Sequence, residues 1–161
     1  MSAIVMVPIG TVSSPRTDSS DDYWGAVESV ITIDSAVLSD EALLGLEAFS
    51  HVEVVYHFHR VAGEKIETGA RHPRGRSDWP RVGILAQRGK ARPNLIGVSR
   101  CRVLAVEGRT LRVRGLDAID GTPVLDIKPY MVEFGPIGDL RQPAWAGEIM
   151  RDYFKDQPDE A

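Results

Sequence analysis

The sequence predicts a mainly β protein, a small single-sheeted β-barrel with a few short helices and long loops. Short β-branched runs recur between turn signals, which is the spacing typical of all-β barrels and sandwiches. The chain has 161 residues, of which 43% are hydrophobic and 26% charged, and this suits one domain with one main core. We place the barrel in residues 1–140, followed by a C-terminal helix and tail in residues 141–161.

The predicted strands are seven β-branched runs, which cover residues 3–12, 27–34, 51–59, 81–87, 99–108, 110–115 and 122–127. Gly108 provides a tight connection, so residues 99–106 and 110–114 are expected to form a hairpin. The run at 51–59 alternates regularly. Its core-facing side chains are predicted to be Val52, Val54, Tyr56 and Phe58.

Two helices are predicted beside the barrel. The first covers residues 39–49, with Ser39 as a candidate N-cap and acids in its first turn; its apolar face comprises Ala42, Leu43, Leu46 and Phe49. The second begins at Pro143 and carries a stripe of Trp145, Ile149 and Tyr153, which indicates packing. Residues 17–24 and 62–79 are expected to be long loops, and residues 156–161 a frayed tail.

Composition narrows the possible compartment and partners. No run is apolar enough to span a membrane, no signal peptide is apparent, and the single Cys101 excludes an internal disulfide, so we expect a cytoplasmic protein. The net charge is −4, yet residues 71–92 hold seven Lys or Arg and one acid. This stretch is either a solvated basic loop or a positive region that gathers an anionic substrate.

Histidines at the end of the third run provide one metal hypothesis. His57 and His59 are two apart on a predicted strand and point the same way, a geometry that metal sites use. No further metal-ligand motif completes a coordination shell, and the alternatives are hydrogen-bonded strand histidines or a ligand-contacting His59. The chain also lacks the glycine-rich motifs of Rossmann and P-loop proteins.

Two polar segments have the chemistry of ligand sites. In "QRGKARPNLIGVS", Arg88 and Arg92 can grip a carboxylate or phosphate, and Gly97 permits close backbone approach. In "DGTPVLDIKPY", Asp126 and Lys128 share one face of an extended run. These two side chains either pair with each other or orient a ligand.

Four stretches together resemble a known family: "IGTVSSP", "GLEAFSHVEVVYHFHR", "ARPNLIGVS" and "LDAIDGTPVLDIKPY". They look like the TsaA-like or YaeB-like proteins, the TrmO family of tRNA methyltransferases. The resemblance implies a barrel that forms a homodimer and binds S-adenosylmethionine without a Rossmann fold. It also implies N-methylation of threonylcarbamoyl-adenosine beside the tRNA anticodon. No metal and no membrane association are expected.

The resemblance also implies roles for individual residues. The catalytic group would comprise Asp126, Lys128 and Tyr130, at or beside the methyl-transfer pocket. Substrate contacts would come from Arg92 and Asn94. The expected cofactor contacts are Tyr23, Trp24, His59, Arg60, Arg88, Val98, Arg114, Gly115, Leu116 and Asp117.

The sequence departs from the family pattern in three places. Residues 21–27 read "DDYWGAV" where tRNA-modifying members carry a basic loop, and these acids would repel a phosphate backbone. Leu95 replaces a second Pro, and the additional C-terminal domain of bacterial members is not present in this sequence. Two alternatives therefore stay open: a methyltransferase for a non-tRNA substrate, and a metal-binding barrel that uses His57 and His59.

Overall fold

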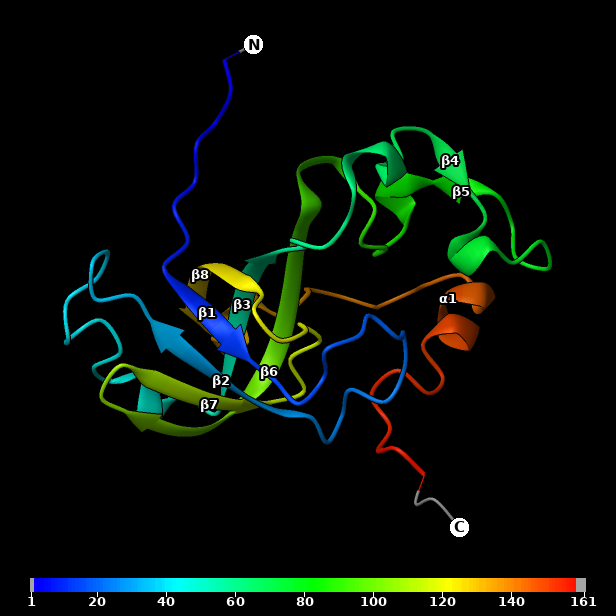
Figure 1. Cartoon of the computed structure of the whole chain (residues 1–161). Helices are drawn as coiled ribbons and strands as arrows, with labels where there is room; N and C mark the ends of the chain where they lie inside the picture. Colours follow the sequence, from blue (N-terminus) through cyan, green and yellow to red (C-terminus); the bar gives the residue numbers. More distant parts are fainter. Residues whose placement is uncertain (1, 159–161) are drawn as a thin grey trace.

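Six antiparallel strands close into a barrel in the computed structural model, which describes residues 2–158 (Figure 1). The strand order around the barrel is β1-β2-β7-β6-β3-β8. The strands are β1 (Gly10–Ser13), β2 (Glu28–Ile33), β3 (His51–His57), β6 (Ile96–Glu107), β7 (Thr110–Arg114) and β8 (Pro123–Pro129). The predicted fold class, a small single-sheeted barrel with short helices and long loops, is confirmed.

Alternation along β3 positions the core as predicted. Val52 and Val54 are fully buried and Tyr56 is 2% exposed, while the residues between them are only partly covered. Each such side chain contributes roughly 1.5–3 kcal/mol through burial. The same inward pattern on the other strands builds one core, whose members include Val12, Ile31, Ile33, Cys101, Leu111, Val113, Leu116 and Val124.

The predicted hairpin is confirmed as β6 and β7, which pair through Glu107 and Thr110. Gly108 makes the turn at a φ of 58°, in the left-handed region that a residue without Cβ adopts freely. Leu111 and Val113 face the core, and the intervening arginines face outward. The β6 strand is thus long enough to cross the whole barrel and reach both of its ends.

The barrel closes at a short seam between β1 and β8. Only two pairs join these strands, Gly10 with Val124 and Thr11 with Pro123, whereas seven pairs join β3 to β6. Three further backbone bonds extend the seam: the Ile9 amide donates to the Val124 carbonyl at 2.8 Å, the Val12 amide to the Thr122 carbonyl at 2.9 Å, and the Gly121 amide to the Val12 carbonyl at 2.8 Å. Of the neighbouring strand pairs in the barrel, β1 and β8 therefore share the fewest paired residues.

A second, two-stranded sheet lies beyond one end of the barrel (Figure 1). It pairs β4 (Ala70–Arg71) with β5 (Val82–Gly83). The predicted strand at 81–87 is therefore wrong in length. After β5 the backbone forms a 3-10 helix, Ile84–Ala86. This helix buries the Ile84 side chain, and the Gln87 amide donates to the Ile84 carbonyl.

The predicted first strand is also too long, because residues 3–9 lie outside the sheet. Ile4 and Val5 are 84% and 87% exposed, and the N-terminal segment extends away from the barrel (Figure 1). Regular pairing begins at Gly10, where the chain meets both β2 and β8. Apolar composition alone predicted a strand where no neighbouring strand pairs with the chain.

The predicted helix at 39–49 is wrong. The segment forms turns followed by a 3-10 helix, Leu46–Ala48. Gly45 has a φ of 87°, which breaks helical geometry in the middle of the run. Leu43 is buried, whereas Leu44 remains 82% exposed. The remaining 3-10 helices are Gly63–Lys65, Pro73–Gly75, Pro93–Leu95 and Val132–Phe134.

The C-terminal helix forms but is short. Helix α1 (Ala144–Ile149) begins directly after Pro143, as predicted, and ends before Tyr153. The Trp79 indole donates to Glu148 at 2.7 Å, which ties α1 to the loop after β4. Residues 156–158 of the predicted tail are exposed, and residues 159–161 lie outside the described residues. The division at residue 140 stays a prediction.

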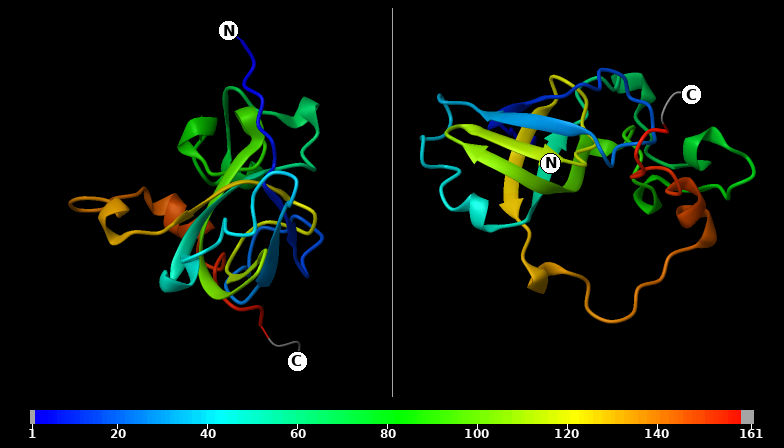
Figure 2. Two further views of the ribbon diagram at one scale, coloured as in Figure 1. Left: turned by 90° about the vertical axis from the view of Figure 1, so that its left-hand side faces the viewer. Right: turned by 90° about the horizontal axis from the view of Figure 1, so that it is seen from below.

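The segment between β8 and α1 arcs away from the barrel wall (Figure 2). It exposes large apolar side chains, among them Val132, Phe134, Ile137 and Leu140. Within residues 2–158, none of the helices has the length and apolarity needed to cross a membrane.

Candidate functional site

The carboxylate of Asp117 accepts hydrogen bonds from three hydroxyl groups, which come from three separate parts of the chain. Asp117 follows β7, after Gly115 in the left-handed region and the fully buried Leu116. Its Oδ1 accepts from the Tyr56 hydroxyl at 3.1 Å and from the Ser99 hydroxyl, and its Oδ2 accepts from the Tyr153 hydroxyl at 2.6 Å. We call these four residues, Tyr56, Ser99, Asp117 and Tyr153, the Asp117 cluster.

Electrostatics keep the donors of the cluster protonated. Burial, and then the negative charge of Asp117, raises the pKa of Tyr56 and of Tyr153. Both phenols therefore donate rather than accept over the ordinary pH range. The Asp117 cluster is a partly buried anionic acceptor held by neutral donors, the type of group that binds hydroxyl or amine donors of a ligand.

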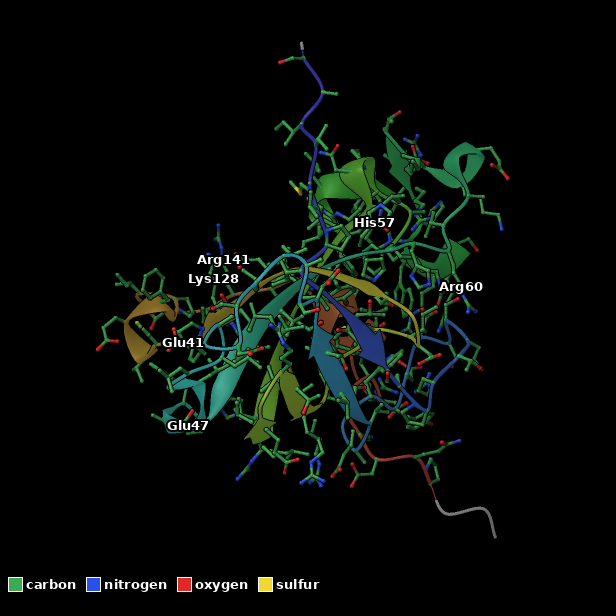
Figure 3. All side chains as sticks on the ribbon, turned by 60° about the vertical axis from the view of Figure 1, so that its left-hand side comes forward. Glu41, Glu47, His57, Arg60, Lys128 and Arg141 are labelled. Atoms are coloured by element: carbon green, nitrogen blue, oxygen red, sulfur yellow. The ribbon has the colours of Figure 1, made fainter. Side chains whose placement is uncertain are left out.

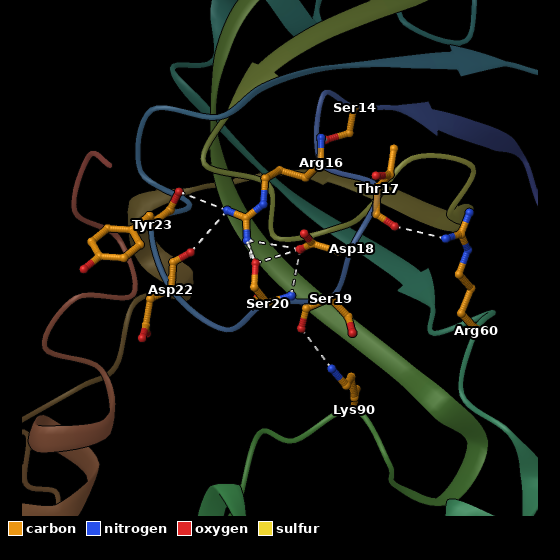
Figure 4. Close-up of polar contacts among 10 residues, drawn as sticks. All are labelled: Ser14, Arg16, Thr17, Asp18, Ser19, Ser20, Asp22, Tyr23, Arg60 and Lys90. Atoms are coloured by element: carbon orange, nitrogen blue, oxygen red, sulfur yellow. Dashed lines mark hydrogen bonds and ion pairs between the residues drawn. The ribbon is translucent and has the colours of Figure 1, made fainter. Parts of the chain in front are cut away.

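The loop that precedes β2 folds around Arg16 (Figure 4). Arg16 Nη1 donates to the carbonyls of Asp22 and Tyr23 at 3.2 and 3.3 Å. Its guanidinium also lies 4.0 Å from the centre of the Trp24 ring. Tyr23 has a φ of 67°, a geometry that the carbonyl contacts with Arg16 stabilise.

The chain after α1 packs against this loop. The Tyr23 amide donates to the Asp152 carbonyl at 3.1 Å, and the Trp24 amide donates to the Tyr153 carbonyl at 2.8 Å. Trp24, an expected cofactor contact, is only 3% exposed, so its ring is covered in this structure. Tyr153 was predicted only to pack, and no local pattern in the sequence signals its bond to Asp117.

Asp21 and Asp22, the acids of this loop, contact a basic residue of the stretch at 71–92. Arg74 pairs with Asp22 at 2.9 Å and lies 3.6 Å from Asp21. Lys90 and Arg60 each donate at 3.0 Å to backbone carbonyls of the same loop (Figure 4). The predicted repulsion between this loop and an anion is thus offset by cations within its own neighbourhood.

The basic residues of the "QRGKARPN" stretch contact backbone carbonyls. Arg88 Nη2 donates to the Val98 carbonyl at 2.7 Å, and Arg92 Nη1 donates to the Gln87 carbonyl at 2.8 Å. Asn94 has a φ of 63°, which turns the chain into β6. Val98 directly precedes Ser99, a member of the Asp117 cluster. Arg88 and Val98 therefore lie beside the Asp117 cluster.

The histidines lie at the end of β3. Partial burial, and then the charge of Arg60, lowers the pKa of His59. No group of three or more His, Cys, Asp or Glu side chains within residues 2–158 is arranged to hold a metal ion. The metal hypothesis for His57 and His59 therefore lacks a third ligand in the described part of the chain.

The predicted catalytic residues lie on the outer wall of the barrel. Lys128 pairs with Asp126 at 2.9 Å, and Arg100 pairs with Glu53 at 2.6 Å. Arg100 also lies 4.8 Å from the centre of the Tyr130 ring. We call these five residues the outer-wall cluster, and Figure 3 shows Lys128 on the side of the barrel away from Arg60.

Within one chain, only part of the predicted site comes together. Tyr23 and Trp24 connect to Asp117 through the segment after α1, and Arg88 donates to the carbonyl of Val98, the residue before Ser99. The catalytic set is not among these contacts, because the Tyr130 amide bonds to His51, the residue at the opposite end of β3 from His57. Arg114 also points outward and pairs with Glu28 at 2.6 Å.

Comparisons with known proteins define the class to which this barrel belongs. A Pyrococcus abyssi protein named "Probable S-adenosyl-L-methionine-binding protein" is 35% identical over 159 residues, which cover 92% of this chain and 77% of the relative. The human tRNA (adenine(37)-N6)-methyltransferase is 36% identical over 95 residues, which cover 59% of this chain and 21% of that enzyme. This similarity places the barrel in a class of S-adenosylmethionine-binding proteins and tRNA methyltransferases.

The chain belongs to the family of the tRNA-methyltransferase O N-terminal domain, whose model matches residues 14–135. The crystal structure of TrmO from Pseudomonas aeruginosa has 31% sequence identity and a TM-score of 0.70, and the match covers 90% of this chain and 62% of that one. The chain therefore spans less than two thirds of the solved TrmO chain. The resemblance predicted from the four motifs is confirmed.

Proposed function

We propose that this chain is an S-adenosylmethionine-dependent methyltransferase that N-methylates a modified adenosine, threonylcarbamoyl-adenosine, in the tRNA anticodon loop. Family membership and the named relatives support the reaction class. The observation that carries the proposal is the Asp117 cluster, a partly buried carboxylate with Trp24 and Arg88 nearby.

The residues present suit the proposed cofactor. The carboxylate of Asp117 accepts from hydroxyl groups, and the guanidinium of Arg88 matches a carboxylate. The Trp24 ring, which is 3% exposed in this structure, would offer an aromatic face once uncovered. The Trp24 Nε1 atom is buried without a hydrogen-bond partner in the described structure, so a donor is present that the protein itself does not satisfy. When bound, S-adenosylmethionine supplies an activated methyl group.

The contribution of the protein to this reaction is positioning. Holding two reactants at near-attack distance supplies roughly 7–11 kcal/mol of barrier reduction, and the transfer needs no covalent residue. Tyr56 and Ser99 fix the orientation of Asp117 from the barrel side. In this proposal Asp117 and Arg88 bind S-adenosylmethionine. Arg92 and Asn94 contact the molecule that accepts the methyl group.

A tRNA partner is supported by charge at the surface. Arg100, Arg102, Arg112 and Arg114 project outward from β6 and β7, and β4, β5 and their loops carry further arginines. Contacts of this kind with phosphates give affinity that falls as salt rises. The pairing of Arg74 with Asp22 reduces the acidic character of the loop before β2.

We also propose a homodimer, because one chain does not bring the two predicted residue sets together. Asp126 and Lys128 pair with each other and Tyr130 lies against Arg100, and none of these contacts includes Asp117. The segment between β8 and α1 exposes Phe134 at 75% and Ile137 at 99%, an apolar surface of the kind that a second copy covers. In such a dimer, one copy would complete the site of the other.

One experiment separates the acceptor hypotheses. Purified protein and S-adenosylmethionine with a labelled methyl group are incubated with bulk tRNA from a strain that lacks the corresponding tRNA methyltransferase. We expect label in tRNA, recovered after digestion as a methylated threonylcarbamoyl-adenosine. Label absent from this tRNA, together with measurable cofactor binding, would instead support the non-tRNA alternative.

A further inference from the structure

The chain after α1 contacts the Asp117 cluster through the Tyr153 hydroxyl. We call residues 152–154 the strap. Two backbone hydrogen bonds hold it, from the amides of Tyr23 and Trp24 to the carbonyls of Asp152 and Tyr153. The Phe154 carbonyl lies so close to Gly25 that a Cβ at that position would clash with it. Gly25 thus permits a close contact between its own backbone and that of the strap, which any larger residue would block.

The two oxygens of Asp117 have different partners. Tyr56 and Ser99, which come from the barrel strands β3 and β6, donate to Oδ1. The strap supplies only the donor to Oδ2, the Tyr153 hydroxyl at 2.6 Å. The orientation of the carboxylate is therefore already fixed by the barrel, and Tyr153 occupies an acceptor that is otherwise open to another hydroxyl.

The docked strap has the features of a reversible contact. Trp24, whose amide donates to the strap, is 3% exposed, and its Nε1 has no partner among the described residues, so the docked strap leaves this donor unsatisfied. The chain that leads to α1, residues 136–143, is exposed throughout. Asp152 of the strap and Lys155, which follows it, make only a local, exposed ion pair at 2.8 Å.

We propose that the strap is a self-cap that competes with the cofactor for Asp117, with the Tyr153 hydroxyl standing where a ribose hydroxyl of the cofactor binds. The proposal rests on the proposed function, in which Asp117 contacts S-adenosylmethionine. Tyr153 lies outside residues 14–135, the part that the family model matches. The cap is therefore a property of this chain's C-terminal segment and regulates access to the barrel site.

The test compares Tyr153→Phe with the unaltered full chain by calorimetry, with S-adenosylmethionine and its demethylated product as separate ligands. Phe keeps the ring and its edge-to-face contact with Phe154 but removes the competing hydroxyl. We expect binding about three- to tenfold tighter, the range for loss of one competing hydrogen bond. Lys155→Ala is the matched control, because it alters the same segment without touching Asp117, and its affinity should equal that of the unaltered chain.

A second measurement follows the strap directly. Hydrogen exchange of the Tyr23 and Trp24 amides, which donate to the strap, is recorded with and without saturating S-adenosylmethionine. We expect their protection to fall when the cofactor binds, since the strap must leave. Unchanged or increased protection would mean that the strap closes over the ligand, which overturns the proposal.

The outcomes separate this inference from the proposed function. Equal or weaker binding by Tyr153→Phe, with measurable binding by the unaltered chain, overturns the self-cap and leaves the cofactor assignment intact. If neither protein binds either ligand, both proposals are overturned. Tighter binding together with lost amide protection supports both.

Discussion

The Asp117 cluster and the outer-wall cluster both place a carboxylate beside donors, but they differ in burial and in the type of donor. Asp117 accepts from hydroxyls of Tyr56, Ser99 and Tyr153, two of which are largely removed from water. On the outer wall, the side chains of Asp126 and Lys128 pair while 47% and 65% exposed. The first arrangement is built by long-range folding, and the second by two neighbouring positions on one strand.

This contrast favours Asp117 over Asp126 as the carboxylate that would contact the cofactor in the proposed function. Water and salt screen an exposed ion pair, so its formation contributes little free energy. A partly buried carboxylate depends on a small number of fixed donors, and replacing one by a ligand hydroxyl changes its environment strongly. We therefore expect conservative substitutions in the Asp117 cluster to have larger effects on cofactor affinity and stability than those in the outer-wall cluster.

The largest expected effect is on cofactor binding by Asp117→Asn. The substitution preserves size but removes the charge that strengthens hydrogen bonds, and such bonds contribute about 1.5–3 kcal/mol. We therefore expect S-adenosylmethionine affinity, measured by calorimetry, to fall by roughly ten- to a hundredfold.

Asp126→Asn is the matched control from the outer wall. It should leave cofactor affinity unchanged while lowering methyl transfer if Asp126 acts on the acceptor. Equal losses of affinity in both variants would remove the distinction between the two clusters.

The second largest expected effect is that of Tyr56→Phe on the stability of the fold. Tyr56 is 2% exposed, and its hydroxyl bonds to Asp117 at 3.1 Å, so we expect the free energy of unfolding to fall by about 1.5–3 kcal/mol. Urea denaturation measures the change. Tyr130→Phe, at a ring that lies against Arg100 on the outer wall, should cost much less, and a larger loss there would contradict the comparison.

A smaller effect concerns Cys101, which is 2% exposed in the core behind the cluster. Burial, and then the charge of Asp117, raises the pKa of the thiol to about 12. Because the folded state holds this proton more tightly than the unfolded chain, the associated stability is complete below the ordinary thiol pKa of 9.0 and is lost as pH rises toward 12.

Thiol labelling checks this environment. At pH 8 the folded protein should react slowly with an aromatic disulfide reagent, and urea should restore rapid labelling. Immediate stoichiometric reaction of the folded chain would show that Cys101 is not sealed in the core.

The smallest expected effect is that of Lys128→Ala on stability. The pKa of Lys128 is raised by its hydrogen bond and charge interaction with Asp126, but the ammonium is exposed. We expect no measurable change in the thermal midpoint at physiological salt. A clear drop that disappears at high salt would mean that the outer-wall cluster stabilises the fold.

Local patterns were sufficient to predict the barrel and its best-defined strands. Alternation identified the buried face of β3, and Gly108 located the β6–β7 turn. The pairing of Asp126 with Lys128 was among the predicted alternatives, because residues two apart on a strand share a face. Each of these features depends on residues close together in the sequence.

Features that depend on distant contacts were missed or predicted wrongly. The helix expected at 39–49 does not form, since Gly45 takes a left-handed conformation there. Tyr153 looked like a packing residue, yet it reaches Asp117 across 36 positions of sequence. Helical spacing identifies apolar faces, but it carries no information on which distant polar atom a side chain will meet.

The two-pair seam between β1 and β8 has a consequence for the behaviour of the protein on heating. A closed barrel presents no free strand edge. Separation of β1 from β8 at the pairs Gly10–Val124 and Thr11–Pro123 would create two free edges, one on each strand. Pro123 lacks an amide hydrogen, so one of those edges offers fewer donors to an incoming strand. Self-association of partly opened molecules should therefore begin along β1, where the apolar Ile9 and Val12 flank the exposed backbone.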